Sequence, residues 1–333
     1  MAHTNAWNVD RLPRQEGRVF LVTGATGGIG YFIAEQLASA GAHVILAVRS
    51  VDKAKLAVQA VRARVADARL STVGLDLGDL DSVRSAAGLL SQRPRLDGVV
   101  LNAGVLARDA RTETADGHEL VYGTNHLGHF ALVALMYPAL ERADGSRVVT
   151  MGSVAARSAT LNLEDLESSR GPYRGFDAYK ASKLAQMIFA FELNRRRQRA
   201  ASRVSSLVAH PGGALDGLTP GRPPVFARTG FSFVRALPLA PFVQGKDHAA
   251  WPPVRALLDP CAEGGQLWGP RFLRWKGAPV IERPTRAMAD LKTAGLLWAL
   301  SEKATGITWS PHQPPLTRGP IGSTPAVQMN PDD

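Results

Sequence analysis

The stretch of sequence that decides the fold reads Arg18-Val19-Phe20-Leu21-Val22-Thr23-Gly24-Ala25-Thr26-Gly27-Gly28-Ile29-Gly30. It opens with a short apolar, β-rich run, and apolar residues at helical spacing follow it (Phe32, Ile33, Leu37). The order strand, glycine turn, helix predicts a cradle for a pyrophosphate at the positive end of the helix. In such a cradle Gly24 makes the tight turn, Gly28 lets the phosphates approach the backbone, and Gly30 allows close packing of helix on strand.

The context of this turn supports a binding site for a dinucleotide rather than an ordinary βα turn without a ligand. A second strand, residues 42–48, completes a βαβ unit of the expected length. Arg49 follows it, at the place where an NAD enzyme carries an acid for the ribose 2′-hydroxyl. Because arginine is always charged and binds phosphate bidentately, Arg49 predicts NADP(H) rather than NAD(H). The alternative for Arg49 is a cation in a surface loop.

Four further strands are predicted at 70–75, 98–101, 147–152 and 203–209, with helical segments between them. This alternation predicts an α/β fold with one doubly wound parallel sheet, the Rossmann fold, in a single domain. Polar or glycine-rich residues follow the strands, where strand ends face the ligand crevice: Asp76 with Leu77, Asn102-Ala103-Gly104, Ser153, and His210-Pro211-Gly212.

Tyr179 and Lys183 are the first candidates for catalytic residues. Apolar residues at helical spacing predict a helix over 179–193, with this pair in its first turn. Residues four apart share a helix face, so the phenol and the ammonium can address the same small volume. A free phenol has a pKa of about 10, which a nearby cation lowers toward the range useful for proton transfer. An ordinary helix face with one Tyr and one Lys is the alternative.

Composition describes a globular chain of 333 residues, 45% hydrophobic and 20% charged. Its one cysteine, Cys261, permits neither an internal disulfide nor a cysteine metal cluster, and no metal site is expected. The amino terminus lacks a secretory apolar run and no stretch is long enough to span a membrane, which predicts a cytoplasmic protein. A net charge of +10 raises nucleic acid as a partner, but the arginines are scattered apart from the run at 195–199, which suits a solvated helix end. No nucleic-acid partner is expected.

The expected organisation is a leader at 1–16, one Rossmann-fold domain at 17–309, and a disordered, proline-rich tail at 310–333. Seven prolines and several aromatic residues break the periodicity between 213 and 260 and preclude long helices there. This insertion could cap the sheet edge and wall an apolar substrate pocket. A merely structural excursion is the alternative. Residues 266–275 suggest a further strand or hairpin, and a last helix carries Met288 to Leu300.

The ordered set of motifs resembles the short-chain dehydrogenase/reductase family. The set comprises residues 23–30, Asn102-Ala103-Gly104, Asn125, Ser153, Tyr179 and Lys183. The run Asn125-His126-Leu127-Gly128-His129-Phe130 and the 26-residue gap from Ser153 to Tyr179 resemble the branch of retinol dehydrogenases and protochlorophyllide reductases. Trp268-Gly269-Pro270 and the last helix resemble actinobacterial oxidoreductases of that branch.

The resemblance implies catalytic roles. Tyr179 would donate the proton in carbonyl reduction, Lys183 would lower its pKa and hold the nicotinamide ribose, and Ser153 would hydrogen-bond the carbonyl oxygen. Asn125 would hold a water in the proton path. The nicotinamide itself carries the hydride.

The resemblance also implies cofactor contacts along the carboxyl edge of the sheet, with Asp76 at the adenine amine and Asn102 with Gly104 on the adenosine side. These contacts fall at Gly24, Thr26, Gly28, Ile29, Gly30, Arg49, Asp76, Leu77, Asn102, Ala103, Gly104, Tyr179, Lys183, Pro211 and Gly212.

One position departs from the family pattern. The family carries a threonine five residues after Pro211 at the nicotinamide carboxamide, whereas this chain has Asp216 there and Thr219 three positions later. Either Thr219 serves in a rearranged loop, or Asp216 accepts a hydrogen bond, or the insertion positions substrate differently.

These features predict an NADPH-dependent reductase of a carbonyl on a bulky hydrophobic substrate, such as a polyketide or another polycyclic or terpenoid metabolite. The alternatives are NADP-dependent oxidation of a retinol- or steroid-like alcohol and, from another class, a cofactor-binding regulator without turnover. The family commonly pairs through the helices that carry Asn125 and Tyr179, which implies a homodimer or homotetramer unless the C-terminal addition alters the pairing.

Overall fold

The computed structural model describes Asn8, residues 11–106 and residues 110–311. Most of the expected leader and tail therefore lies outside the described residues. The chain forms an eight-stranded sheet in the order β3-β2-β1-β4-β5-β6-β7-β8. The strands are β1 (Val19–Thr23), β2 (His43–Val48), β3 (Arg69–Gly74), β4 (Gly98–Leu101), β5 (Arg147–Met151), β6 (Ser205–Ala209), β7 (Leu267–Phe272) and β8 (Lys276–Glu282).

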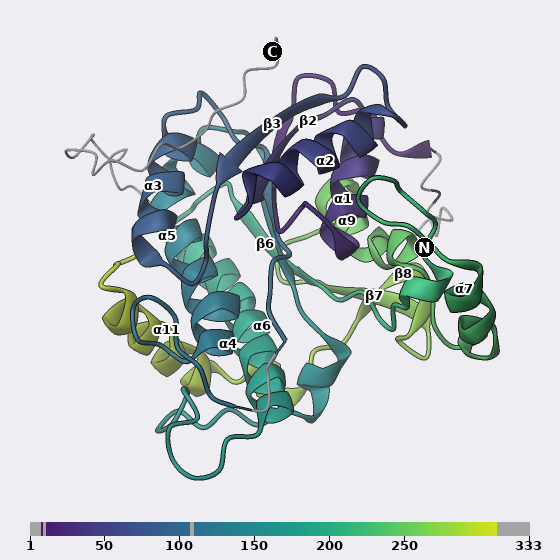
Figure 1. The fold of residues 1–333 in the computed structure, drawn as a ribbon. Coiled ribbons are helices and arrows are strands. Elements are labelled where there is room, and N and C mark those ends of the chain that lie inside the picture. The colour runs from purple at the N-terminus through teal and green to yellow at the C-terminus, as the bar shows by residue number, and fades with distance from the viewer. Residues whose placement is uncertain (1–7, 9–10, 107–109, 312–333) are drawn as a thin grey trace.

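The helices cover both faces of this sheet (Figure 1). They are α1 (Gly28–Ser39), α2 (Val51–Arg62), α3 (Leu80–Ser91), α4 (Leu120–Tyr122), α5 (Gly128–Glu141), α6 (Gly175–Arg199), α7 (Gly230–Ala236), α8 (Lys246–Ala249), α9 (Trp251–Leu258), α10 (Arg286–Ala289) and α11 (Leu291–Thr305). Shorter turns are the π-helical η2 (Gly123–Leu127) and the 3-10 turns η3 (Val154–Ser158), η4 (Asp216–Leu218) and η5 (Leu237–Leu239).

Strands β1 to β7 run parallel, and β8 returns antiparallel to β7. Strand order grows outward in both directions from β1 and β4, so the ligand crevice of such a sheet lies at their carboxyl ends. The predicted doubly wound parallel sheet is confirmed, and each of the six predicted strands lies within two residues of its expected bounds.

Alternation along the strands builds a core on each face. Phe20 and Val22 of β1 face α1, α2 and α9, whereas Leu21 between them faces α3, α5 and α6. Strands buried on both faces read as continuous apolar runs, which is why the sequence shows no alternation of polar and apolar residues there.

Helix α6 corrects one expectation. The sequence placed Tyr179 to Lys183 in the first turn, but α6 begins at Gly175. Asp177 suits this earlier start because a carboxylate near the positive helix end is favourable, and it forms an ion pair with Lys180 at 2.7 Å. Tyr179 and Lys183 still lie one turn apart on the same helix.

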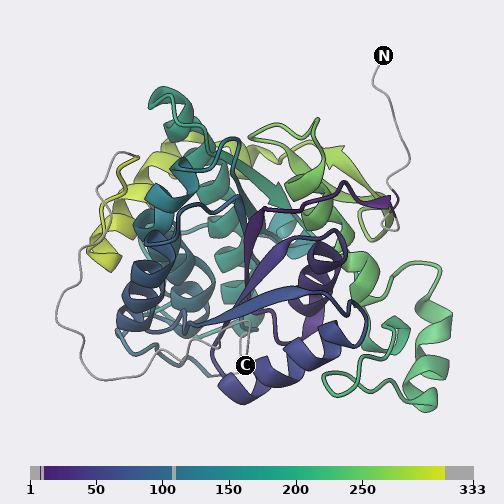
Figure 2. The ribbon, with the colours of Figure 1, turned by 90° about the horizontal axis from the view of Figure 1, so that it is seen from above.

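The proline-rich segment 213–260 divides into two parts. Helix α9 carries Pro252 and Pro253 in its first turn, where a missing N–H costs little, and buries Val254 and Leu257 against the sheet. It is therefore the crossover helix between β6 and β7 rather than part of a surface excursion. Residues 213–245 lie outside this layer, and in Figure 2 the green segment around α7 stands out at the lower right.

Helix α11 covers α6 and η2 on the other face. Its Trp298 packs edge-on to Phe130 at 5.1 Å and stacks on Phe189 at 5.7 Å, and the Arg196 guanidinium lies 4.4 Å from its ring. Within the part of the chain that the structure describes, no helix has the length and apolar character needed to cross a membrane.

Candidate active site

The glycine turn after β1 has the geometry of a phosphate cradle. Gly24 and Gly28 adopt φ of +68° and +57°, a region that favours glycine. A Cβ at Gly30 would lie 2.4 Å from Gly24 O, so only glycine lets α1 pack this closely on the turn. A Cβ at Gly28 would meet open space among the described residues, and no side chain of the described residues caps the α1 amino terminus. The cradle therefore leaves its helix N–H groups available to an anion.

Thr23 locks this cradle to the end of β4. Its carbonyl accepts a hydrogen bond from Asn102 Nδ2 and its hydroxyl accepts one from Ala103 N, both at 2.9 Å. The predicted adenosine-side residues are thus held directly beside the glycine turn. Thr23 was missed as a site residue because it reads as the last residue of a buried strand.

Arg49 and Asp76 lie together at the carboxyl ends of β2 and β3. Arg49 NH1 is 3.9 Å from Asp76 Oδ2, and the Arg49 side chain is 75% exposed. Asp76 is fixed by a hydrogen bond from Gly78 N to its Oδ1 at 3.0 Å. An exposed guanidinium on a loosely held ion pair is free to turn toward a phosphate.

Ser153 and Tyr179 meet at the ends of β5 and α6. Burial raises the pKa of the Tyr179 phenol, and a hydrogen bond with the Ser153 side chain acts in the opposite direction. The net direction differs from the lowering that was expected from Lys183. Burial has the larger effect, and the Lys183 ammonium donates instead to Met151 O at 3.1 Å and to Gln186 Oε1 at 2.7 Å. A lowered tyrosine pKa stays a prediction for the cofactor-bound protein.

Lys183 lies in a group of buried polar side chains between α6 and the glycine turn. Burial lowers its pKa to about 8. Gln186 Nε2 lies 3.2 Å from His129 Nδ1, and His129 Nε2 lies 3.0 Å from Thr23 Oγ1. Burial also lowers the pKa of His129 to about 4, so this ring is neutral at physiological pH. His129 Nδ1 donates to Asn125 O at 2.9 Å and its Nε2 accepts from the Thr23 hydroxyl, so the hydrogen bonds of the ammonium end at Gln186, and this buried polar group was not predicted from the sequence.

Asn125 lies in the π-helical turn η2, a local geometry often found at functional sites. Its Oδ1 accepts from Val105 N at 2.8 Å, and its Nδ2 donates to Val105 O and to Ser182 Oγ. A Cβ at Gly104 would lie 3.0 Å from Asn125 Oδ1 and 3.5 Å from Lys183 Nζ. The Asn125 carboxamide thus joins the end of β4 to α6, and its role in holding a water stays a prediction.

A buried charge cluster fixes the loop after β6, and sequence reasoning missed it. His210 Nε2 lies 2.9 Å from Glu282 Oε1, with these side chains 2% and 6% exposed. Gly212 N donates to His210 Nδ1 at 3.3 Å, which suits the tautomer with its proton on Nε2. Glu282 Oε2 also pairs with Arg157 at 3.5 Å and with Arg274 at 3.1 Å. The cluster joins η3, which follows Ser153, to the predicted cofactor residues Pro211 and Gly212.

Beyond Gly212 the chain turns into the segment that carries Asp216 and Thr219. Thr219 is 1% exposed, donates to Leu215 O at 2.8 Å and accepts from Lys246 N at 3.0 Å. Its hydroxyl is committed to the fold, which disfavours it as a replacement cofactor contact. Asp216 forms an ion pair with Lys246 and its side chain is 61% exposed, so it is the more accessible of the two.

Asp216 lines an open pocket of about 560 Å³. The walls combine residues 214–217 with apolar Phe231, Ala236 and Leu239 and with polar Ser232, Arg235 and Lys246. Ser153, Tyr179 and Lys183 are not among its lining residues. The pocket therefore adjoins the predicted nicotinamide loop rather than containing the catalytic side chains.

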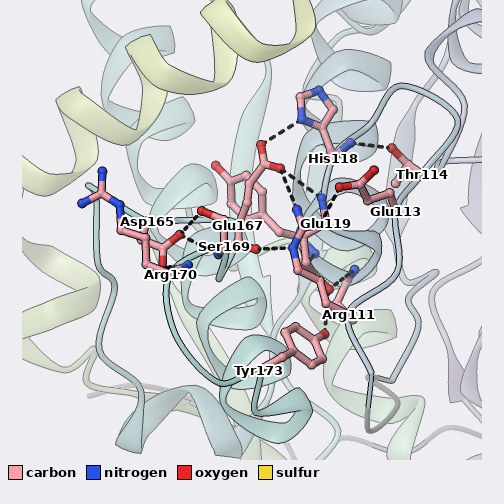
Figure 3. Close-up of polar contacts among 12 residues, drawn as sticks. Arg111, Glu113, Thr114, His118, Glu119, Asp165, Glu167, Ser169, Arg170 and Tyr173 are labelled. Carbon is pink, nitrogen blue, oxygen red and sulfur yellow. Dashed lines mark hydrogen bonds and ion pairs between the residues drawn. The ribbon is translucent and has the colours of Figure 1, made fainter.

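Polar contacts hold the long segment between Ser153 and Tyr179 (Figure 3). Glu167 Oε1 lies 2.9 Å from His118 Nδ1 and its Oε2 accepts from Glu119 N at 3.1 Å. Tyr173 donates from its hydroxyl to Glu119 Oε1 at 2.8 Å. These contacts fasten the segment to the start of α4. Just beyond them Phe176, 66% exposed, stacks near Tyr179 with ring centroids 6.3 Å apart.

Fold and site together define a doubly wound α/β oxidoreductase with a dinucleotide cradle and a Ser-Tyr-Lys constellation. A family model described as short chain dehydrogenase matches residues 18–215. The chain belongs to this family, in its retinol dehydrogenase-like branch.

Several known proteins resemble the chain over most of its length. Mouse polyprenol dehydrogenase is 36% identical over 300 residues, covering 89% of this chain and 86% of that protein. Human retinol dehydrogenase 12 is 34% identical over 295 residues, covering 88% of each chain.

Two solved structures are also similar. A protein from Mycobacterium paratuberculosis has a TM-score of 0.74 at 33% identity and covers 92% of this chain and 99% of its own. A short chain dehydrogenase from Escherichia coli CFT073 complexed with NADPH has a TM-score of 0.50 at 26% identity. The match covers 62% of this chain and 80% of that one.

Proposed function

We propose that the protein reduces a carbonyl group on a bulky hydrophobic substrate, with NADPH as the hydride donor. The observation that carries the proposal is the meeting of Ser153 with Tyr179 beside the buried Lys183 at the carboxyl edge of the sheet. The glycine cradle fits a dinucleotide, because Gly28 faces open space and Gly24 and Gly30 admit no side chain without strain or clash. Bound there, the nicotinamide supplies the hydride.

The protein side chains handle the oxygen and its proton. As the hydride adds to the carbonyl carbon, the π electrons move to oxygen, which takes the phenolic proton of Tyr179. Ser153 donates a hydrogen bond to the same oxygen while its negative charge develops. With the cofactor bound, Lys183 would hold the nicotinamide ribose, and its charge would favour the phenolate that Tyr179 becomes.

Tyr179→Phe tests this assignment. Removal of one hydroxyl should lower turnover by about two to four orders of magnitude, while NADPH binding measured by fluorescence persists. Gln198→Ala, at an exposed position near the other end of α6, serves as the control for effects on the helix. Turnover close to that of the wild type in Tyr179→Phe would refute the assignment.

The substrate class needs a separate test. Purified protein with NADPH should reduce polycyclic ketones in preference to small polar keto acids. Phe231, Ala236 and Leu239 in the wall of the 560 Å³ pocket support this preference, while Asp216, Arg235 and Lys246 form its polar side. A preference for the small acids would overturn it.

Oxidation of a hydrophobic alcohol with NADP+ is the second candidate. The names of the relatives favour it, since they denote dehydrogenases of polyprenol and retinol. Incubation with NADP+ and retinol or a polyprenol, followed by aldehyde detection, compares the two directions. A regulator without turnover is disfavoured because the Ser-Tyr-Lys set is complete, and activity in either assay would exclude it.

NADP(H) rather than NAD(H) is supported by Arg49 and by the NADPH complex of the Escherichia coli relative. A homodimer or homotetramer through α5 and α6 must use surface that α11 leaves free, because α11 packs on α6 and η2. Light scattering on the purified protein measures the assembly. The cytoplasmic location and the actinobacterial type stay predictions.

A further inference from the structure

Exposed apolar side chains gather in two short stretches of this protein. Fifteen large hydrophobic residues are exposed in the described part of the chain, and eight of them fall within 231–242 and 272–275. They are Phe231, Val234, Leu237, Leu239, Phe242, Phe272, Leu273 and Trp275. Single exposed apolar residues are normal on a soluble protein, whereas a concentration of this kind marks an interaction site.

The two stretches adjoin in space. Lys276 Nζ donates to Ala240 O at 2.6 Å, which fastens the β7–β8 hairpin to the chain after η5. A Cβ at Gly213 would lie 2.3 Å from the Trp275 ring and 2.8 Å from Val243 Cγ1, so the hairpin turn also rests on the segment beside Val243. We call residues 228–242 together with 271–275 the α7–hairpin surface.

Positive charge surrounds these apolar side chains. The sequence from 217 to 246 contains no aspartate or glutamate. The Arg228 guanidinium lies 4.6 Å from the Phe233 ring and that of Arg235 lies 5.4 Å from the Phe231 ring, while Arg271 is exposed on the hairpin. Arginines that lie along aromatic rings keep their charged ends at the level of polar headgroups while the rings enter apolar surroundings. The pattern is complementary to a surface with phosphate groups above hydrocarbon.

The hairpin turn has an unusual backbone. Leu273 and Arg274 both adopt positive φ, 49° and 64°, where turns of this type favour Asn-Gly. Leu273 is nevertheless 67% exposed, so the strained turn presents an apolar side chain to solvent. Strain kept in such a place points to a function of the turn.

We propose that the α7–hairpin surface docks on a lipid bilayer that contains anionic headgroups. Its leucine, valine and aromatic side chains enter the boundary between headgroups and acyl chains, and Arg228, Arg235 and Arg271 pair with lipid phosphates. The net charge of +10 attracts the whole protein to such a membrane.

Docking also orients the candidate site toward the bilayer. Gly212 and Gly213, which continue the predicted nicotinamide loop, contact Trp275 of the hairpin. Leu239 and Phe231 belong both to this surface and to the pocket beside Asp216. Resting on the proposed function, the inference adds that the hydrophobic substrate enters from the membrane rather than from water.

Vesicle co-sedimentation tests the docking without reference to turnover. The probes are vesicles of phosphatidylcholine and phosphatidylglycerol in a two-to-one mixture and vesicles of phosphatidylcholine alone. The wild type should bind the anionic vesicles preferentially and be released by salt. Arg228→Ala with Arg235→Ala should lower the partition coefficient about fivefold for each arginine. Leu237→Ser with Leu273→Ser should lower it about tenfold for each leucine.

The matched control is Leu291→Ser, because Leu291 is 64% exposed at the start of α11 and outside this surface. It should bind as the wild type does. Absence of wild-type binding to anionic vesicles, or an equal loss in the control, overturns the proposal. A dimer in light scattering that Leu237→Ser with Leu273→Ser dissociates also overturns it, since a second copy would then cover the surface.

Turnover of a water-soluble ketone separates this proposal from the proposed function. Without vesicles, Leu237→Ser with Leu273→Ser should match the wild type. Activity without vesicle binding refutes the docking alone, whereas vesicle binding by a protein inactive toward every carbonyl and alcohol refutes the proposed function alone.

Discussion

Glu282→Gln should disturb the loop that carries Pro211 and Gly212 while leaving the sheet intact. Burial by itself raises the pKa of the Glu282 carboxyl, but the hydrogen bond from His210 and the charges of Arg274 and Arg157 outweigh it and hold the pKa below its usual value. Glutamine keeps the size of the side chain and removes its charge. His210 then loses its charge-assisted partner, and the two guanidiniums lose theirs.

The magnitude follows from burial. Breaking a fully buried ion pair costs about 3–5 kcal/mol, but Arg157 and Arg274 are 26% and 52% exposed and water compensates part of the loss. We expect a decrease in the free energy of unfolding of about 2 kcal/mol, which for a chain of this size lowers Tm by about 3 °C. Because His210 accepts from Gly212 N, loosening the ring also loosens the cofactor loop, and the KM for NADPH should rise about tenfold.

The pH dependence has a definite sign. The pKa of Glu282 is lower in the folded protein than in the unfolded chain, so its contribution to stability is present above the unfolded value, about pH 4.3, and is lost as pH falls through the folded value. The difference in Tm between the wild type and Glu282→Gln should therefore shrink on acidification below that pH. Thermal scans from neutral to acidic pH measure it.

Asp97→Asn is the matched control. Asp97 is a carboxylate with a 2% exposed side chain that pairs with Arg95 and accepts a hydrogen bond from Val19 N. It lies at the amino-terminal ends of β1 and β4, away from the carboxyl ends where the cofactor loop lies. It should lower Tm by a similar amount and leave the KM for NADPH unchanged. A Glu282→Gln enzyme that binds NADPH as tightly as the wild type would refute the positioning role of the cluster.

Three further predictions concern the cofactor half of the site. Arg49→Ala should raise the KM for NADPH about 10–100-fold and leave that for NADH unchanged, because charged hydrogen bonds to the 2′-phosphate are lost; equal effects on both cofactors would contradict it. In the reduction direction kcat/KM should fall above pH about 8 as Lys183 loses its proton. Gln186→Glu should move this decrease to higher pH, because a carboxylate beside Lys183 favours the ammonium. If the decrease does not move, another group is responsible for it. Gly30→Ala should destabilise the fold by about 1–3 kcal/mol, measured by denaturant unfolding, whereas Gly27→Ala at φ −177° with open space around it should not.

The parts of this protein that the sequence predicts are those fixed by neighbouring residues. The strand before Gly24 and the turn through Gly30 lie within one run of sequence, and so does the Tyr179–Lys183 pair on its helix. The start of α6 was missed because the turn from Gly175 has exposed residues and no side-chain cap at Arg174, so periodicity gives no signal there. The place of α9 was missed because two prolines at its first turn look like a loop.

Residues paired across long stretches could not be found in this way. His210 and Glu282 are 72 positions apart, and Thr23 and His129 are 106 apart. Only the place of His210 at a strand end offered a signal, whereas Glu282 lies on an antiparallel edge strand whose register depends on the hairpin turn. Such contacts become visible only when the fold has brought the strands together.

The site therefore has two halves, which differ in how far their residues can be substituted. The cofactor half is built from backbone: a Cβ at Gly24 or Gly30 meets other residues at 3.0 Å or less, so few substitutions are tolerated. The pocket beside the predicted nicotinamide loop is built from side chains, among them Asp216, Phe231 and Leu239. Substitutions at the exposed tip of the β7–β8 hairpin can therefore change the proposed membrane contact while the glycine cradle keeps its geometry. For this reason the sequence predicts the chemistry of the protein more closely than it predicts its substrate.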